Sequence, residues 1–193
     1  MTQTQSSAAR EIDGRSVPQA GSWAIDPSHS SVAFVARHLM VAKVRGVFSG
    51  YDADFTVGER PEDSTLNVTI QAASIGTRDE GRDGHLRSAD FLDVERYPTL
   101  TFVSSAVRPD GDEWKVDGTL TIRGVGRPAT LDVEFNGVAT DPWGNERAFF
   151  TAGTEFDRED FGLTWNQPLA NGGVLVGKKV KVEIEVEAVR VEG

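Results

Sequence analysis

The chain of 193 residues contains no cysteine. It therefore cannot form a disulfide, supply a thiolate nucleophile, or hold zinc or an iron–sulfur cluster through sulfur. It also lacks an apolar run near the roughly 18 to 20 residues that a membrane-spanning helix requires, and its first twenty residues have no apolar centre typical of a secretory signal. We therefore expect a cytoplasmic protein that does not insert into a membrane.

Positive charge is also scarce: 20 Lys and Arg stand against 30 Asp and Glu, which gives a formal net charge of −10. This balance opposes the counterion release that drives binding to phosphate backbones, so we expect no nucleic-acid partner. The three histidines, His29, His38 and His85, do not have the spacing of a short zinc motif. A phosphate-binding glycine loop and a Gly-x-Ser-x-Gly elbow are absent as well. We therefore predict no metal, no cofactor and no catalytic residue, and expect that the protein is not an enzyme.

From Trp23 onward, the sequence shows two-residue alternation of apolar and polar side chains, the period of a β-strand with one dry face. In the clearest case, charged residues alternate with Val180, Val182, Ile184 and Val186. Turn sequences such as Pro109-Asp110-Gly111 separate the segments and favour antiparallel hairpins. About eight strands are indicated, the number at which a closed barrel holds side chains or one small ligand. The pattern predicts an all-β protein with a single closed antiparallel barrel of about eight strands.

Two segments interrupt the alternation, and we expect both to cover the barrel mouth. Residues 74–97 indicate one or two short helices, with Asp79 or Ser88 as possible caps. Residues 157–177 are rich in Gly, Asn and Pro yet carry large apolar side chains, which favours a packed segment over a free loop. Residues 1–21 are too poor in apolar groups to offset the entropy of ordering. We therefore predict a flexible N-terminal tail over 1–21 and a barrel domain over 22–193.

Alternation alone does not decide whether the barrel interior holds a cavity or is filled by side chains. Small residues expected to point inward either leave space for a ligand or are small because the barrel tapers. They are Ala36, Ala72, Gly118, Ala129, Ala148 and Ala152. His38 continues an apolar face and is either a polar anchor for a ligand head group or a core histidine satisfied by a hydrogen bond. A ligand-binding barrel and a filled-core interaction protein, with a possible homodimer, are both consistent with the pattern.

Five segments share their residues and their order with a known family. They are Trp23-Ala24-Ile25-Asp26-Pro27-Ser28-His29-Ser30, the stretch from Arg82 to Asp93, Tyr97-Pro98-x-Leu100-x-Phe102, Gly118-x-Leu120-Thr121-Ile122-x-Gly124-Val125, and Arg158-x-Asp160-Phe161-Gly162. In these segments the chain resembles the YceI-like family of small bacterial lipid-binding proteins. The resemblance implies a lipocalin-like barrel of eight antiparallel strands whose apolar lumen holds a long isoprenoid chain or a similar amphiphile.

The same resemblance implies a carrier or storage protein that binds a polyisoprenoid, an isoprenoid quinone or another lipid-like molecule without chemistry. The ligand-binding residues transferred from it are Val32, Phe34, Ala36, His38, Phe48, Leu86, Phe91, Phe102, Phe161 and Leu163. The first alternative is an enzyme that acts on a lumen-bound isoprenoid-like substrate, with His38 or an acidic residue as acid or base. The second is the filled-core interaction protein.

Overall fold

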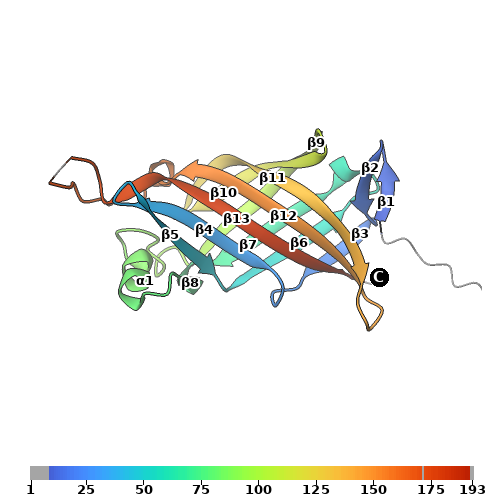
Figure 1. The fold of residues 1–193 in the computed structure, drawn as a ribbon, viewed down its shortest axis with the longest axis horizontal. Helices are drawn as coiled ribbons and strands as arrows, with labels where there is room; N and C mark the ends of the chain where they lie inside the picture. The colour runs from blue at the N-terminus through green and yellow to red at the C-terminus, as the bar shows by residue number, and fades with distance from the viewer. Residues whose placement is uncertain (1–8, 171, 192–193) are drawn as a thin grey trace, which may run out of the picture.

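The alternating segments form a β-barrel in the computed structural model, which describes residues 9–170 and 172–191 (Figure 1). Its strands are β3 (Gly21–Ile25), β4 (Ser31–His38), β5 (Ala42–Phe48), β6 (Tyr51–Val57), β7 (Thr65–Gln71), β9 (Thr99–Asp110), β10 (Glu113–Ile122), β11 (Val125–Thr140), β12 (Glu146–Asp157) and β13 (Val176–Arg190). The strands β3 and β4 both pair with β13, and β6 and β5 pair with β3 and β4 in turn. The strands β3 and β4 are therefore two parts of one bent barrel strand, and β5 and β6 are two parts of the next.

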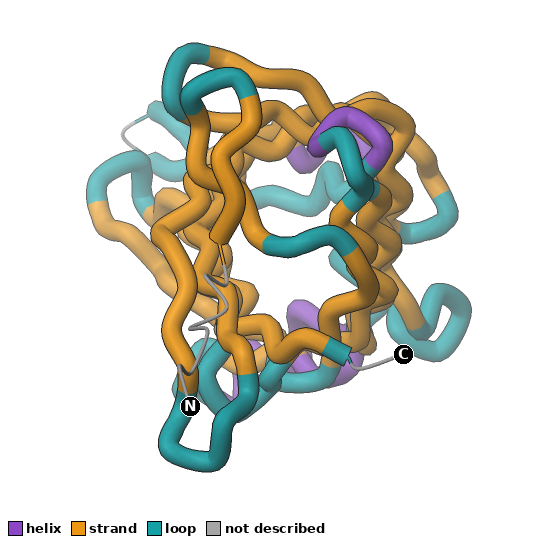
Figure 2. Tube along the Cα trace, turned by 90° about the vertical axis from the view of Figure 1, so that its right-hand side faces the viewer, coloured by secondary structure: helices purple, strands orange, loops and turns teal. Residues whose placement is uncertain are grey.

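The barrel closes because its last strand pairs with its first. All pairings are antiparallel, and β13 lies between β12 on one side and β3 and β4 on the other. Seen from the end at the right of Figure 1, the strands form a ring (Figure 2). The prediction of a closed antiparallel barrel of eight strands is confirmed.

The register explains why the alternation produces a dry interior. Val133 on β11 lies opposite Ala152 on β12, which lies opposite Ile184 on β13. Because facing residues of paired strands point to the same side of a sheet, these three side chains share the inner face. The charged residues Lys181 and Glu183 alternate with the apolar residues on β13 and belong to the outer face.

One end of the barrel carries the two segments that interrupt the alternation (Figure 1). The first contains the short elements η2 (Ala72–Ser74) and β8 (Ile75–Gly76), followed by the helix α1 (Glu80–Arg87). Asp79 caps α1, as predicted, by accepting a hydrogen bond from the Arg82 backbone nitrogen at 2.9 Å. The second segment begins with η3 (Arg158–Phe161). Both segments pack into one core cluster that includes Phe91, Leu92, Phe161 and Leu163, so they are fixed parts of the fold.

The prediction of a flexible tail over 1–21 is wrong for residues 9–18, which form the hairpin of β1 (Ala9–Ile12) and β2 (Arg15–Pro18). Residues 1–8 lie outside the described residues. The turn consists of Asp13 and Gly14, both with positive φ, at +52° and +75°. An Asp-Gly pair of this kind is a common turn of two-residue hairpins. The low apolar content suggested that this segment could not be ordered. The hairpin is ordered because its few apolar side chains pack against the barrel.

The element η1 (Pro61–Asp63) connects β6 to β7 near the hairpin end of the barrel. Among the described residues, no helix is both long enough and apolar enough to cross a membrane.

Candidate functional site

A cavity of about 330 Å³ runs along the barrel lumen. Leu86 of α1 and Phe91 in the segment after it line the cavity at one end, and Val17 and Pro18 of the hairpin line it at the other. The lining is apolar almost throughout; the exceptions are Ser30, Tyr51, Ser64, Thr65, Thr154, Arg158 and Glu185. The Tyr51 hydroxyl donates to the Ser30 carbonyl oxygen at 2.8 Å, so even this polar group is engaged within the protein. The lumen is suited to an apolar guest.

Eight of the ten residues transferred from the resemblance line this cavity: Val32, Phe34, Ala36, Phe48, Leu86, Phe91, Phe102 and Leu163. His38 and Phe161 do not. His38 lies past an irregularity in the β4–β13 pairing, between Val176 and Val180, beside the exposed β4–β5 turn. Phe161 belongs to η3, where strand alternation does not apply, and packs edge-on against Phe156 at a centroid distance of 5.1 Å. Contact with a ligand stays a prediction for all ten residues.

Three of the small inward residues help to create the space. Ala36, Ala129 and Ala152 line the cavity. Ala72 and Ala148 instead pack within core clusters, where each is at most 1% exposed. Gly118 is covered by an aromatic ring: a Cβ atom there would lie 2.6 Å from Phe102 Cζ. The other small residues therefore serve packing, and the alanines on β4, β11 and β12 leave room for a guest.

A cluster of three rings lies over the α1 end of the lumen. His85 packs edge-on against Phe91 and Trp165, at centroid distances of 5.0 and 4.5 Å, and the two other rings are 5.3 Å apart. The His85 Nε2 atom also lies 2.8 Å from Asp90 Oδ2. These contacts join α1, the segment after it and the segment after η3, so the predicted lid segments meet over the lumen.

Arg158 fastens the second lid segment to the barrel. Its side chain is buried, and it donates hydrogen bonds to the backbone carbonyl oxygens of Gly177 at 3.0 Å, Val176 at 3.4 Å, and Leu163. Burial lowers the pKa of its guanidinium below the ordinary value. The neighbouring Glu159 instead pairs with Lys178 at the surface, at 2.7 Å. Arg158 is therefore held by backbone oxygens, without a carboxylate partner among the described residues.

Sequence reasoning missed part of the lining. Along β6, Tyr51, Ala53, Phe55 and Val57 face the lumen, and their alternation in the sequence would have identified them. Trp114 on β10 also lines the cavity, and the same alternation would have identified it. The lining residues of the hairpin carry no comparable signal, because β2 is short and its burial depends on strands far along the chain.

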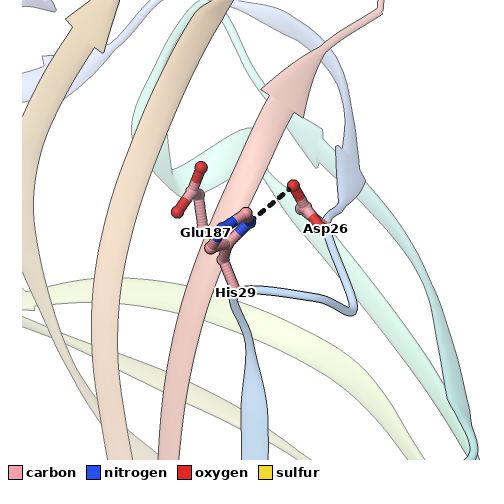
Figure 3. Close-up of side chains that lie close together, drawn as sticks. All are labelled: Asp26, His29 and Glu187. Atoms are coloured by element: carbon pink, nitrogen blue, oxygen red, sulfur yellow. Dashed lines mark hydrogen bonds and ion pairs between the residues drawn. The ribbon is translucent and has the colours of Figure 1, made fainter. Parts of the chain in front are cut away.

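A polar cluster on the outside of the barrel has a different character. Asp26, His29 and Glu187 place possible metal-ligand atoms within 4.8 Å of one another (Figure 3). However, the Arg147 guanidinium donates to Asp26 Oδ2 at 2.8 Å, to Asp141 Oδ2 at 3.0 Å, and to Glu187. The carboxylates are thus already neutralised by a guanidinium, and the donor set does not fit a metal ion. The cluster joins the β3–β4 and β11–β12 turns to β12 and β13.

This cluster should contribute to the acid sensitivity of the fold. Hydrogen bonds, chiefly from Arg147, hold the pKa of Asp26 well below its usual range. Hydrogen bonds, chiefly from the Asn145 side chain, lower the pKa of Asp141 to about 2. Both carboxylates therefore stay ionised in the folded state at a pH where the unfolded chain binds protons. Their stabilisation is fully present above about pH 4 and is lost as the pH falls toward about 2.

We expect Arg147→Met to weaken this dependence, because the pKa of Asp26 would then return toward its value in the unfolded chain. The melting temperature, followed by circular dichroism between about pH 6 and pH 2, should fall less steeply on the acid side than in the wild type. Arg60→Met is the control, since Arg60 is exposed and only approaches Glu62 at 3.9 Å. Equal acid-side slopes for Arg147→Met and the wild type would contradict the assignment.

The fold and the cavity together define a closed antiparallel barrel of the kind that encloses one apolar small molecule. The chain belongs to the YceI-like family, since the model of the YceI-like domain matches residues 23–188. A UPF0312 protein of Staphylococcus aureus (strain MSSA476) is 42% identical over 166 residues, which are 84% of this chain and 94% of that protein.

Solved structures show the same architecture. A YceI protein of Campylobacter jejuni is 32% identical, with a TM-score of 0.69 over 81% of this chain and 90% of that one. BcnA of Burkholderia cenocepacia is 23% identical, with a TM-score of 0.71 over 84% of this chain and 98% of that one. A polyisoprenoid-binding domain of Saccharophagus degradans, implicated in plant cell wall breakdown, is 16% identical, with a TM-score of 0.62 over 88% and 98% of the two chains. The latter two show the likeness of fold alone.

Proposed function

We propose that the protein binds a long apolar amphiphile, of the polyisoprenoid or isoprenoid-quinone type, in the barrel lumen and carries or stores it unchanged. The observation that carries this proposal is the continuous, almost wholly apolar lining between α1 and the hairpin. A lumen of this kind favours an apolar guest, because burial removes apolar surface of the guest and of the wall from water.

The expected binding free energy of such a ligand is sufficient for stable binding. At about 0.3 kcal/mol per non-hydrogen atom, a ligand of roughly 40 such atoms would gain about 12 kcal/mol. This corresponds to a dissociation constant near about one nanomolar. A ligand held this tightly should remain bound through purification.

The comparisons support the chemical class of the ligand, and the lining of the cavity supports binding without a reaction. Membership of the YceI-like family, together with a structural neighbour described as a polyisoprenoid-binding domain, supports an isoprenoid-like ligand. His38, one of the candidate acids or bases of the enzymatic alternative, does not line the cavity. The Tyr51 hydroxyl, which does line it, is engaged with the Ser30 carbonyl oxygen. The lining thus favours retention of the guest over its conversion.

The test is native mass spectrometry of the purified protein, followed by organic extraction and identification of what is released. We expect a complex with one lipid-like molecule per chain, of several hundred daltons, and the same molecule in the extract. A bare polypeptide mass, together with failure of the delipidated protein to bind long-chain prenols or fatty acids, would overturn the proposal. A molecule released in chemically altered form after incubation would favour the enzyme instead.

A further inference from the structure

The β1–β2 hairpin lies at the end of the barrel opposite α1 (Figure 1). It precedes residue 23, where the match to the YceI-like domain begins. The hairpin is therefore an addition to the part of the chain that defines the family. Its position raises the question of what it does at the end of the lumen.

Two arginines fasten the hairpin across this end. The Arg10 guanidinium donates to the Glu59 carbonyl oxygen at 2.6 Å and to that of Gly58, both in the connection after β6. Arg15 Nε donates to the Gly111 carbonyl oxygen at 3.0 Å, in the turn between β9 and β10. The strand β2 also packs against β11. The hairpin is thus attached to parts of the barrel rim that belong to different strand pairs.

The inner side of the hairpin forms the end wall of the cavity. Val17 is only 2% exposed, Pro18 is buried as well, and both line the lumen together with Val57 and Trp114 of the barrel wall. The chain leaving the hairpin is also tied down, because the Trp23 indole donates to the Gln19 carbonyl oxygen at 3.1 Å. An apolar chain that extends along the lumen from α1 would meet Val17 and Pro18.

We propose that the hairpin is a floor that makes the lumen a blind tunnel, with its mouth under α1, and that Val17 sets the longest apolar chain the tunnel accepts. This inference rests on the proposed function, since it concerns the fit of the same ligand. Each methylene buried in the tunnel should raise the affinity about fourfold. A chain that is already in contact with the floor gains nothing from further methylenes, because they would remain in water at the mouth.

The test measures the affinity of the delipidated full-length protein for saturated fatty acids of increasing length, by competition with a fluorescent fatty acid. In the wild type, affinity should rise with length and then level off at a limiting length. Val17→Trp, which extends the floor into the lumen, should move this limit to shorter chains. The double variant Arg10→Met, Arg15→Met, which releases the hairpin from the rim, should move the limit to longer chains or remove it.

Val103→Trp is the matched control, because Val103 is 51% exposed and does not line the cavity; its limiting length should equal that of the wild type. If Val17→Trp fails to fold, the arginine variant, which changes no cavity-lining residue, still decides the question. The same limiting length in the wild type and the arginine variant would overturn the role of the hairpin while leaving the carrier intact. Failure of the wild type to bind any chain would instead overturn the proposed function.

Discussion

Replacing Arg158 by methionine should lower the free energy of unfolding by about 3 kcal/mol or more. The guanidinium serves three backbone carbonyl oxygens, those of Leu163, Val176 and Gly177, where the second lid segment meets β13. Methionine fills a similar volume but donates no hydrogen bond, so the oxygens of Leu163 and Gly177 would lose this partner in a buried region, whereas that of Val176 keeps its hydrogen bond from Asn166 Nδ2 at 2.7 Å. Each unsatisfied buried group costs about 1–3 kcal/mol. Urea unfolding of delipidated protein, followed by tryptophan fluorescence, measures the effect.

Two further variants separate the geometry of Arg158 from its charge. Arg158→Lys keeps the charge but cannot reach the three oxygens with one ammonium group, so it should recover only part of the loss. Lys178→Met removes a surface cation that pairs with Glu159 and is 60% exposed, and it should change stability by no more than about 0.5 kcal/mol. An Arg158→Met protein with the wild-type urea midpoint would show that the lid segment is held by its apolar contacts alone.

Replacing Ala152 by tryptophan should abolish ligand retention without unfolding the protein. Ala152 lines the cavity and lies opposite Val133 and Ile184, so the indole would extend into the lumen. A ligand displaced from about 150 Å² of apolar contact would lose about 4 kcal/mol, which is an affinity loss of several hundredfold. The ring should cause little overpacking, because the space it enters is the cavity itself. The lipid extracted per mole of purified variant measures the effect.

The control for this variant is Ala106→Trp, which makes the same substitution at an exposed position of β9. It should retain lipid as the wild type does. Both variants should keep the wild-type far-ultraviolet spectrum and a melting temperature within a few degrees of the wild type. If Ala152→Trp protein carries the same lipid in the same amount, the ligand is held outside the lumen.

The barrel could be predicted because the alternation that indicates each strand lies within the sequence of that strand. Inward and outward residues alternate along each strand, so the sequence near Val182 is enough to identify one dry face. Phe34 and Ala36, which share one parity on β4, both line the cavity. For this class of fold, the orientation of most lining residues follows from parity within one strand.

The exceptions depend on contacts that no local pattern contains. His38 shares the parity of Ala36 but does not line the cavity; it is the last residue of β4 and lies beyond the shift in the β4–β13 pairing. Phe161 lies in a short 3-10 helix and fills the core behind the wall. The burial of Val17 depends on partners that follow much later in the chain. Only the Asp13-Gly14 turn signalled the hairpin, and it indicated a turn without indicating the surface against which the hairpin packs.

The closure of the ring by β13 has a consequence for how the chain reaches its native state. Ala36 pairs with Val180, so the final seam joins residues that are far apart in sequence, and the entropy of closing so long a loop opposes it. Contacts of this range make folding slow. During synthesis from the N-terminus, the sheet lacks this last strand until residues 176–190 have left the ribosome. Until then, β4 and β12 have unpaired edges and the apolar inner face is open on one side, so the nascent chain exposes surface that favours aggregation.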